Sequence, residues 1–121
     1  MSARTRRHAV LRPRLRVLRG DEVALGPGKV ALLEAIGRER TMAGAARALG
    51  MSYMRAWTLA RTMNRSFRAP LVRTGRGGAA GGVTALTPAG ARAVRLYREM
   101  EHASLRASAR PWARLRRLLR P

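Results

Sequence analysis

The side chains with the clearest chemical potential lie on one face of the stretch between positions 53 and 67. Met54, Thr58, Arg61 and Arg65 recur three or four residues apart, so a helix here would place them on one side. An arginine guanidinium offers a fork of donors that fits phosphate, and threonine and methionine suit the edges of bases. The stretch contains no acidic residue. Its pattern therefore predicts binding to a polyanion.

The charge of the whole chain favours the same interpretation. The 121 residues include 26 basic and 6 acidic side chains and carry a net charge of +20, and Lys29 is the only lysine. Eleven arginines and no acid occur from Arg40 to Arg98. Such a field repels itself in the compact state unless a polyanion neutralises it. Nucleic acid is the favoured partner, with an anionic membrane or simple solvation as the alternatives.

Several kinds of chemistry have no support in the sequence. There is no cysteine, which excludes disulfides, thiol catalysis and cysteine-based zinc sites. His8 and His102 have no cluster of ligands near them, and the serines and threonines lack a histidine and carboxylate arrangement for nucleophilic catalysis. The run "GRGGAAGG" lacks the Gly-Lys-Ser/Thr ending of a nucleotide P-loop. We therefore expect no enzyme, no cofactor and no metal.

The elements that position the basic face follow from apolar spacing and capping residues. Alternation predicts an edge strand near residues 11 to 19, followed by a turn at "GDE". A first helix is expected over "GPGKVALLEAIGRER", a short second one after the N-cap Thr41, and a third from about Tyr53 to Phe67 after the N-cap Ser52. Ala56, Leu59, Ala60, Met63 and Phe67 form the apolar stripe of this third helix.

The segment after the third helix predicts a hairpin and a long helix. "LVRT" and "VTALT" are β-prone runs on either side of the glycine-rich "GRGGAAGG". Thr87 and Pro88 begin a fourth helix that is expected to end near Ala107. The tail "PWARLRRLLR" is basic and amphipathic. Three roles are open for it: packing in a dimer, contact with phosphates, or contact with an anionic membrane, in decreasing order.

Together these elements predict a winged helix-turn-helix. The fold class is mainly α with a small β wing and a long C-terminal dimerisation helix, over residues 1–110, with residues 111–121 as the tail. The third helix would lie in a major groove, with Trp57 partly buried at the edge of the core. The candidate DNA contacts are Thr41, Ser52, Tyr53, Met54, Arg55, Thr58, Arg61, Thr62, Arg65, Arg73 and Arg76.

The sequence also resembles the N-terminal DNA-binding domain of molybdate-responsive transcription regulators of the ModE type, which are similar to LysR-type winged helices. The resemblance lies in "GPGKVALLEAI", "AARALGMSYMRAWTLARTMN", "LVRTGRGGAAGG" and "LTPAGARAVRLY". It implies a homodimer built through the first and fourth helices, and control of transcription from a palindromic operator. In the family a molybdate-binding region follows this domain, and the expectation is a single-domain protein without it. Met54 and Arg61 depart from the family pattern, where a basic and an acidic residue are common.

The expected function is sequence-specific binding of double-stranded DNA in transcription control, in the bacterial cytoplasm at the nucleoid. Two other functions remain open. One is a nucleoid-like or RNA-binding module that uses charge without choosing a sequence. The other is a DNA-binding subunit that docks a separate oxyanion-sensing protein. No stretch of about 18 apolar residues exists, so no helix is expected to span a membrane. A membrane is the least favoured of the partners considered.

Overall fold

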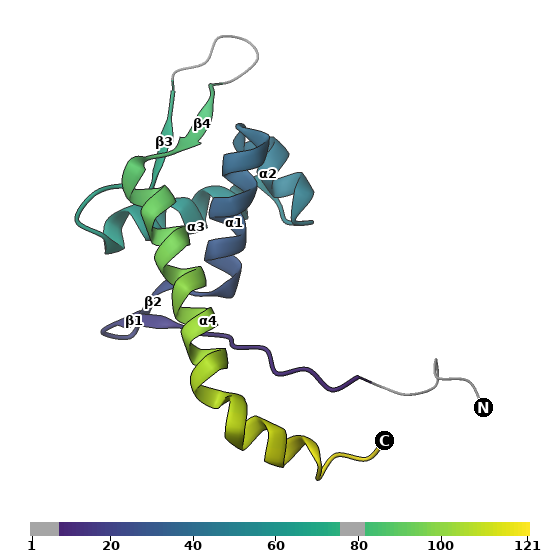
Figure 1. Cartoon of the computed structure of the whole chain (residues 1–121). Coiled ribbons are helices and arrows are strands. Elements are labelled where there is room, and N and C mark those ends of the chain that lie inside the picture. Colours follow the sequence, from purple (N-terminus) through teal and green to yellow (C-terminus); the bar gives the residue numbers. More distant parts are fainter. Residues whose placement is uncertain (1–7, 76–81) are drawn as a thin grey trace.

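The computed structural model describes residues 8–75 and 82–121 and confirms the predicted fold class. Three helices form a compact unit, a two-stranded hairpin projects from it, and a long helix runs away from the hairpin along one side (Figure 1). None of the described helices is both long and apolar enough to cross a membrane. The elements in chain order are β1 (Val17–Arg19), β2 (Glu22–Leu25), α1 (Pro27–Glu39), α2 (Met42–Ala48), α3 (Tyr53–Ser66), β3 (Val72–Thr74), β4 (Thr84–Leu86) and α4 (Pro88–Arg116).

Hydroxyl side chains fix the starts of α2, α3 and α4, as predicted. At the start of α4, the Oγ1 of Thr87 accepts a hydrogen bond from the N–H of Gly90 at 3.0 Å. The Oγ1 of Thr41 accepts a hydrogen bond from the N–H of Gly44 at 3.0 Å, and the Oγ of Ser52 accepts one from the N–H of Arg55 at 3.0 Å. Each bond satisfies a donor that has no partner inside the helix. Gly50 adopts a φ of +65°, which is the left-handed conformation that the tight turn between α2 and α3 requires.

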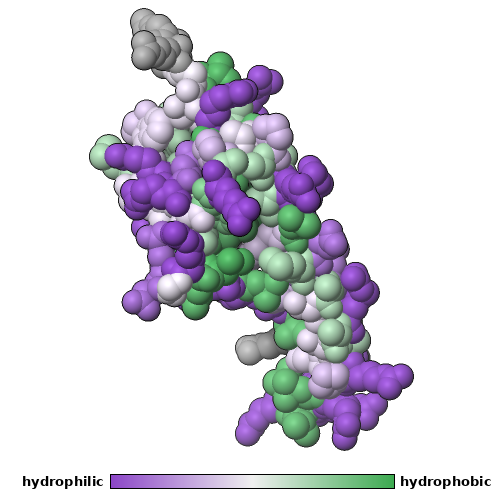
Figure 2. Space-filling model, turned by 90° about the vertical axis from the view of Figure 1, so that its left-hand side faces the viewer, coloured by the Kyte–Doolittle hydropathy of each residue, from purple (hydrophilic) through white to green (hydrophobic). Residues whose placement is uncertain are grey.

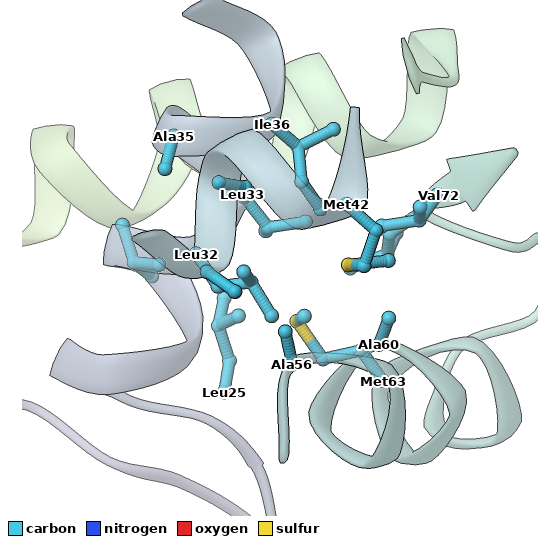
Figure 3. Close-up of a cluster of buried hydrophobic side chains, with 14 of the residues drawn as sticks. Leu25, Leu32, Leu33, Ala35, Ile36, Met42, Ala56, Ala60, Met63 and Val72 are labelled. Atoms are coloured by element: carbon cyan, nitrogen blue, oxygen red, sulfur yellow. The ribbon is translucent and has the colours of Figure 1, made fainter. Parts of the chain in front are cut away.

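The core lies where α1, α2 and α3 meet the strands β2 and β3 (Figure 3). Leu32, Leu33 and Ile36 of α1 are fully buried, and they face Ala56 and Met63 of α3. The predicted apolar stripe of the third helix therefore includes the buried residues of α3. This packing holds α3 against α1 through one side and leaves the opposite side of α3 outside the core.

The N-terminal region differs from its prediction. Only Val17–Arg19 of the expected strand is paired, and its antiparallel partner is β2, which begins inside the predicted "GDE" turn. Residues 8–16 form no ladder, and Pro13 lacks the N–H that one would need. This segment is instead fixed by a side chain, because the buried Tyr97 of α4 donates its hydroxyl to the carbonyl of Leu15 at 2.7 Å. Burial raises the pKa of Tyr97.

The fourth helix is longer than predicted. The sequence predicts an end near Ala107 and a new segment from Pro111, but α4 continues through Pro111 to Arg116. Proline removes one helical hydrogen bond, the one that would reach the carbonyl of Ala107. Both residues are exposed, so water can satisfy that carbonyl. The domain boundary at residue 110 stays a prediction, but the first part of the tail is helical.

An ion-pair network joins α4 to α1. The guanidinium of Arg98 donates to both carboxylate oxygens of Glu34, at 2.6 and 3.1 Å, and to Glu101 at 2.7 Å. The hydrogen bonds from Arg98 lower the pKa of Glu34, and the two carboxylates raise the pKa of Arg98. Bidentate pairs of this kind fix the relative orientation of two elements.

This network predicts a pH dependence of stability. The pKa of Glu34 is lower in the folded than in the unfolded chain, so its contribution is present above the unfolded value of about 4.3 and is lost as the pH falls through the folded value. We expect Glu34→Gln to flatten the acid side of a curve of melting temperature against pH between about pH 5 and 2. The control is Glu99→Gln on α4, whose carboxylate forms no ion pair among the described residues. Equal acid slopes for the two variants would contradict the prediction.

Candidate nucleic-acid interface

The outer face of α3 consists of side chains that point away from the core. Met54 is 66% exposed, and Thr58, Arg61 and Arg65 are also exposed. Ala56, Ala60 and Met63 on the opposite face are buried. The helix therefore presents two arginines, a hydroxyl and a thioether together on one surface. This is the face that the spacing of these residues predicted.

Hydroxyl groups on and beside this face are held by the backbone. Thr58 donates to the carbonyl of Met54 and Thr62 to the carbonyl of Thr58, each at 2.9 Å. These bonds restrict the rotamers of the two threonines. Thr41 and Ser52 are exposed as well, and their side-chain oxygens serve as helix caps. The structure thus gives these two residues a folding role alongside the predicted contact role.

One flank of α3 faces the hairpin of β3 and β4, which is the predicted wing. The rings of Tyr53 and Trp57 meet edge to face, with centroids 6.2 Å apart. Tyr53 is 51% exposed and Trp57 is half-buried, which confirms the expected partial burial of Trp57. A small cavity of about 110 Å³ separates these rings from Thr41, Thr74 and Thr84. The aromatic pair and this cavity therefore lie between α3 and the wing.

The wing is an antiparallel pair in which Val72 faces Leu86 and Thr74 faces Thr84. Arg73 is exposed on β3, and Arg76 lies outside the described residues. The N–H of Thr84 donates to the carbonyl of Arg40 at 2.9 Å, which ties β4 to the end of α1. The base of the wing is thereby fixed to the helical unit.

Asn64 joins α3 to the wing, and sequence reasoning did not single it out. Its Oδ1 accepts the N–H groups of Leu71 at 2.8 Å and Val72 at 3.1 Å, and its Nδ2 donates to the carbonyl of Val72 at 3.0 Å. A signal was available. Asn64 follows Ala60 by one helical turn, and asparagine has a short side chain with both a donor and an acceptor for backbone groups.

The other flank of α3 faces the β1–β2 hairpin and the start of α1. Arg55 lies on this flank with Leu59, where both line a groove, and not in the middle of the outer face. At the end of the helix Ser66 donates to the Oε1 of Glu22 at 2.9 Å. Glu22 is therefore an acidic group in direct contact with α3. The described residues contain no cluster of three or more side chains suited to hold a metal ion.

Comparisons with known proteins relate the chain to a group named for molybdenum. It is 42% identical over 85 residues to the molybdenum-pterin-binding protein MopB of Rhodobacter capsulatus, covering 70% of this chain and 32% of that protein. It is 44% identical over 78 residues to the molybdenum transport protein ModE of Azotobacter vinelandii, covering 64% and 29%. MopA of Rhodobacter capsulatus is 43% identical over 76 residues, covering 63% and 29%.

No family model matches the sequence. The chain spans about a third of the length of the curated relatives it matches. The similarity therefore concerns one part of those proteins. Over roughly two thirds of its own length, this chain is homologous to ModE and to the Mop proteins.

Proposed function

We propose that this chain binds double-stranded DNA in a sequence-specific manner, as a homodimer, and regulates transcription. The observation that carries the proposal is the outer face of α3, which is cationic, exposed and free of acids, on the second helix of a helix-turn-helix next to a wing. A basic helix face by itself is often only a solvated surface. On this element of this fold it has the shape and charge that suit a major groove.

The proposed division of labour follows from the chemistry of each side chain. Tyr53, Met54 and Thr58 lie at the first turns of α3, the end of a recognition helix that reaches base edges. Arg61 and Arg65 lie further along the same face, and we assign them to backbone phosphates, which fix position without reading sequence. Arg73 of the wing takes the same role.

The homodimer has support in the pattern of α4. Leu96 is 48% and Met100 41% exposed, although both are large and apolar. They belong to a series of apolar residues spaced alternately four and three apart, which is the spacing of a helix–helix seam. The series is Ala89, Ala93, Leu96, Met100, Ala103 and Ala107. A two-fold dimer would place two α3 helices in successive major grooves about 34 Å apart, so the operator would be palindromic.

The exposed end of α4 has a different character. Leu115, Leu118 and Leu119 are exposed among arginines, and apolar and hydrophilic side chains mix at this end of the molecule (Figure 2). We propose that this basic amphipathic end serves the dimer or the DNA backbone. A location in the cytoplasm at the nucleoid follows from the proposed function, and the proposal includes no catalytic step and no cofactor.

The names of the relatives link the proposed regulator to molybdenum. Because the shared region includes the helix-turn-helix, we propose that this chain corresponds to the DNA-binding part of such proteins. A separate oxyanion-sensing protein that docks on this chain is the second candidate, and the apolar series on α4 is the surface that favours it.

The test is selection of bound duplexes from a random pool at about 150 mM salt, followed by titration of the selected duplex with wild type and Arg61→Ala. We expect an inverted repeat with half-sites one helical turn apart. Arg61→Ala should weaken binding about ten-fold and lower the slope of log affinity against log salt by about 1. The matched control is Arg95→Ala, which removes an exposed arginine from α4.

Each alternative gives a different result. Tight binding without enrichment of any sequence, with a steep salt dependence, would replace the specific regulator by a charge-driven nucleic-acid binder. Equal losses in Arg61→Ala and Arg95→Ala would show that net charge matters and the α3 face does not. Enrichment of a sequence only after addition of a separate oxyanion-binding protein would favour the subunit that docks a sensor.

A further inference from the structure

A basic groove lies beside α3, on the flank that faces the N-terminal hairpin. It has a volume of about 360 Å³, and three parts of the chain form its walls. Arg14 and Arg16 come from the segment before β1, Lys29 from the first turn of α1, and Arg55 from the first turn of α3. The remaining lining residues are Val23, Gly26, Pro27, Gly28, Met51 and Leu59.

The groove is suited to an anion. Its lining includes four cationic side chains and no carboxylate. Arg14, Arg16 and Arg55 are exposed, whereas Lys29 is half-buried and donates to the carbonyl of Val23. Burial lowers the pKa of Lys29, and Glu22 opposes that shift. A single surface arginine is normally solvated by water, but several convergent ones create a local potential that concentrates anions.

The start of α1 adds to this potential. The helix begins at Pro27 after Gly26, with no side chain capping it and no acid in its first turn. The N–H groups of Gly28 and Lys29 therefore point out of the helix end without an intrahelical partner. The helix dipole adds partial positive charge at the same place. The arginines and the N-terminus of α1 therefore both contribute positive potential to the groove.

The position of the groove relative to α3 would place it next to a DNA backbone. The wing and the β1–β2 hairpin lie on opposite sides of α3 (Figure 1). Tyr53 and Trp57 face the wing, whereas Arg55 and Leu59 face the groove. A major groove that receives α3 is about 12 Å wide and is bordered by one sugar–phosphate backbone on each side. The wing is next to one of these backbones, and the basic groove is next to the other.

We propose that the groove of Arg14, Arg16, Lys29 and Arg55 binds a backbone phosphate of the DNA strand that lies opposite the wing. This inference rests on the proposed function. It adds to it a contact with the sugar–phosphate backbone on the side opposite the wing. Arg55, predicted from sequence as a DNA contact, becomes a phosphate contact here. The N-terminal segment, which Tyr97 fixes by its hydrogen bond to Leu15, becomes part of the DNA-binding surface.

The test compares two double variants that remove the same charge. Arg14→Gln with Arg16→Gln removes two arginines from the groove, and Arg92→Gln with Arg95→Gln removes two exposed arginines from α4, which packs on α1 and β4. Affinity for one duplex is measured between about 50 and 200 mM salt, and each lost phosphate contact lowers the slope by about 0.9. We expect the groove variant to lower the slope by about 1 and the α4 variant to leave it unchanged.

Affinity for an unrelated duplex should fall by the same factor in the groove variant, because phosphate contacts carry no sequence information. Slopes equal to wild type in both variants, or lowered equally in both, would overturn the inference. Wild type that shows no salt-dependent binding to duplex DNA would overturn the proposed function itself, which is a different outcome. The single variant Arg14→Gln should lower the slope by about half as much. It provides a second test if the double variant does not fold.

A free phosphate ion has the same chemistry as a backbone phosphate, so a further measurement separates the two sources. Melting temperatures of wild type and the groove variant are taken with inorganic phosphate at constant ionic strength. We expect no difference in the phosphate response, because the site uses a backbone held in place by α3. A phosphate-dependent stabilisation that disappears in the groove variant, together with an unchanged DNA slope, would assign the groove to a free ion and overturn the DNA assignment.

Discussion

Gly90→Ala should lower the free energy of unfolding by about 3 to 5 kcal/mol or prevent folding altogether. A Cβ atom at position 90 would lie 2.1 Å from the carbonyl oxygen of Leu71 and 3.0 Å from its carbonyl carbon. Both atoms belong to the backbone, so no side-chain rotation relieves the contact. The same carbonyl accepts the N–H of Thr87 at 3.0 Å, and the Oγ1 of Thr87 donates to the carbonyl of Pro70 at 2.6 Å. The start of α4 would have to separate from the segment that leads into β3.

The matched control is Gly28→Ala in the first turn of α1. Its Cβ would meet no atom within 4 Å, and its backbone has no positive φ. Alanine there should be neutral or stabilise by up to about 1 kcal/mol, because it reduces the entropy of the unfolded chain. Both variants are compared by urea denaturation followed by circular dichroism. A Gly90→Ala protein as stable as Gly28→Ala would contradict the close approach of α4 to Leu71.

Gly90 shows which features of this fold could not be predicted from the sequence. Thr87 and Pro88 predicted the start of α4 correctly, because caps and proline act within one turn of chain. The glycine three residues after Thr87 gave no such signal, since its reason is a backbone 19 residues earlier in the chain. The strand β2 was missed for a similar reason. A strand that pairs only with its neighbour across a tight turn shows little apolar alternation of its own.

The candidate site also has a part that could be predicted from the sequence and a part that could not. The outer face of α3 follows from spacing alone, because residues 54, 58, 61 and 65 share a side of any helix. The groove around Arg55 could not be predicted, since Arg14, Arg16 and Lys29 approach it only through the path of the β1–β2 hairpin. The predicted end of the fourth helix was wrong because proline usually stops a helix. Here the carbonyl that Pro111 leaves without a helical partner lies on an exposed surface, where it is tolerated.

Asn64→Ala is expected to cost about 2 to 4 kcal/mol and to release the wing from α3. The substitution removes the acceptor for the N–H groups of Leu71 and Val72, and these two residues are 1% and 4% exposed. A buried donor without a partner costs about 1 to 3 kcal/mol. The carbonyl of Val72 also loses the donor Nδ2, although it has a second lone pair for other partners.

Two further variants separate this role from a general effect on α3. Asn64→Asp keeps an oxygen for both N–H groups but loses the donor, so its loss of stability should be smaller than that of Asn64→Ala. Thr58→Ala lies on the same helix and removes only a bond to the carbonyl of Met54, so it should change stability by less than about 0.5 kcal/mol. Urea denaturation measures all three.

Hydrogen exchange tests the positional part of the prediction. In Asn64→Ala the amides of Leu71 and Val72 should exchange much faster than in wild type, while those in α1 change only by the factor that the global loss of stability explains. The wing would then still pair β3 with β4, but it would be held to the helical unit without a side-chain bond from α3, through Thr84 and Arg40 and through the packing of β3. Under the proposed function, a less firmly held wing lowers the affinity for DNA, because the wing must then be ordered on binding. Uniform acceleration of all amides would leave Asn64 with a purely structural role, and unchanged exchange at Leu71 and Val72 would contradict the anchor.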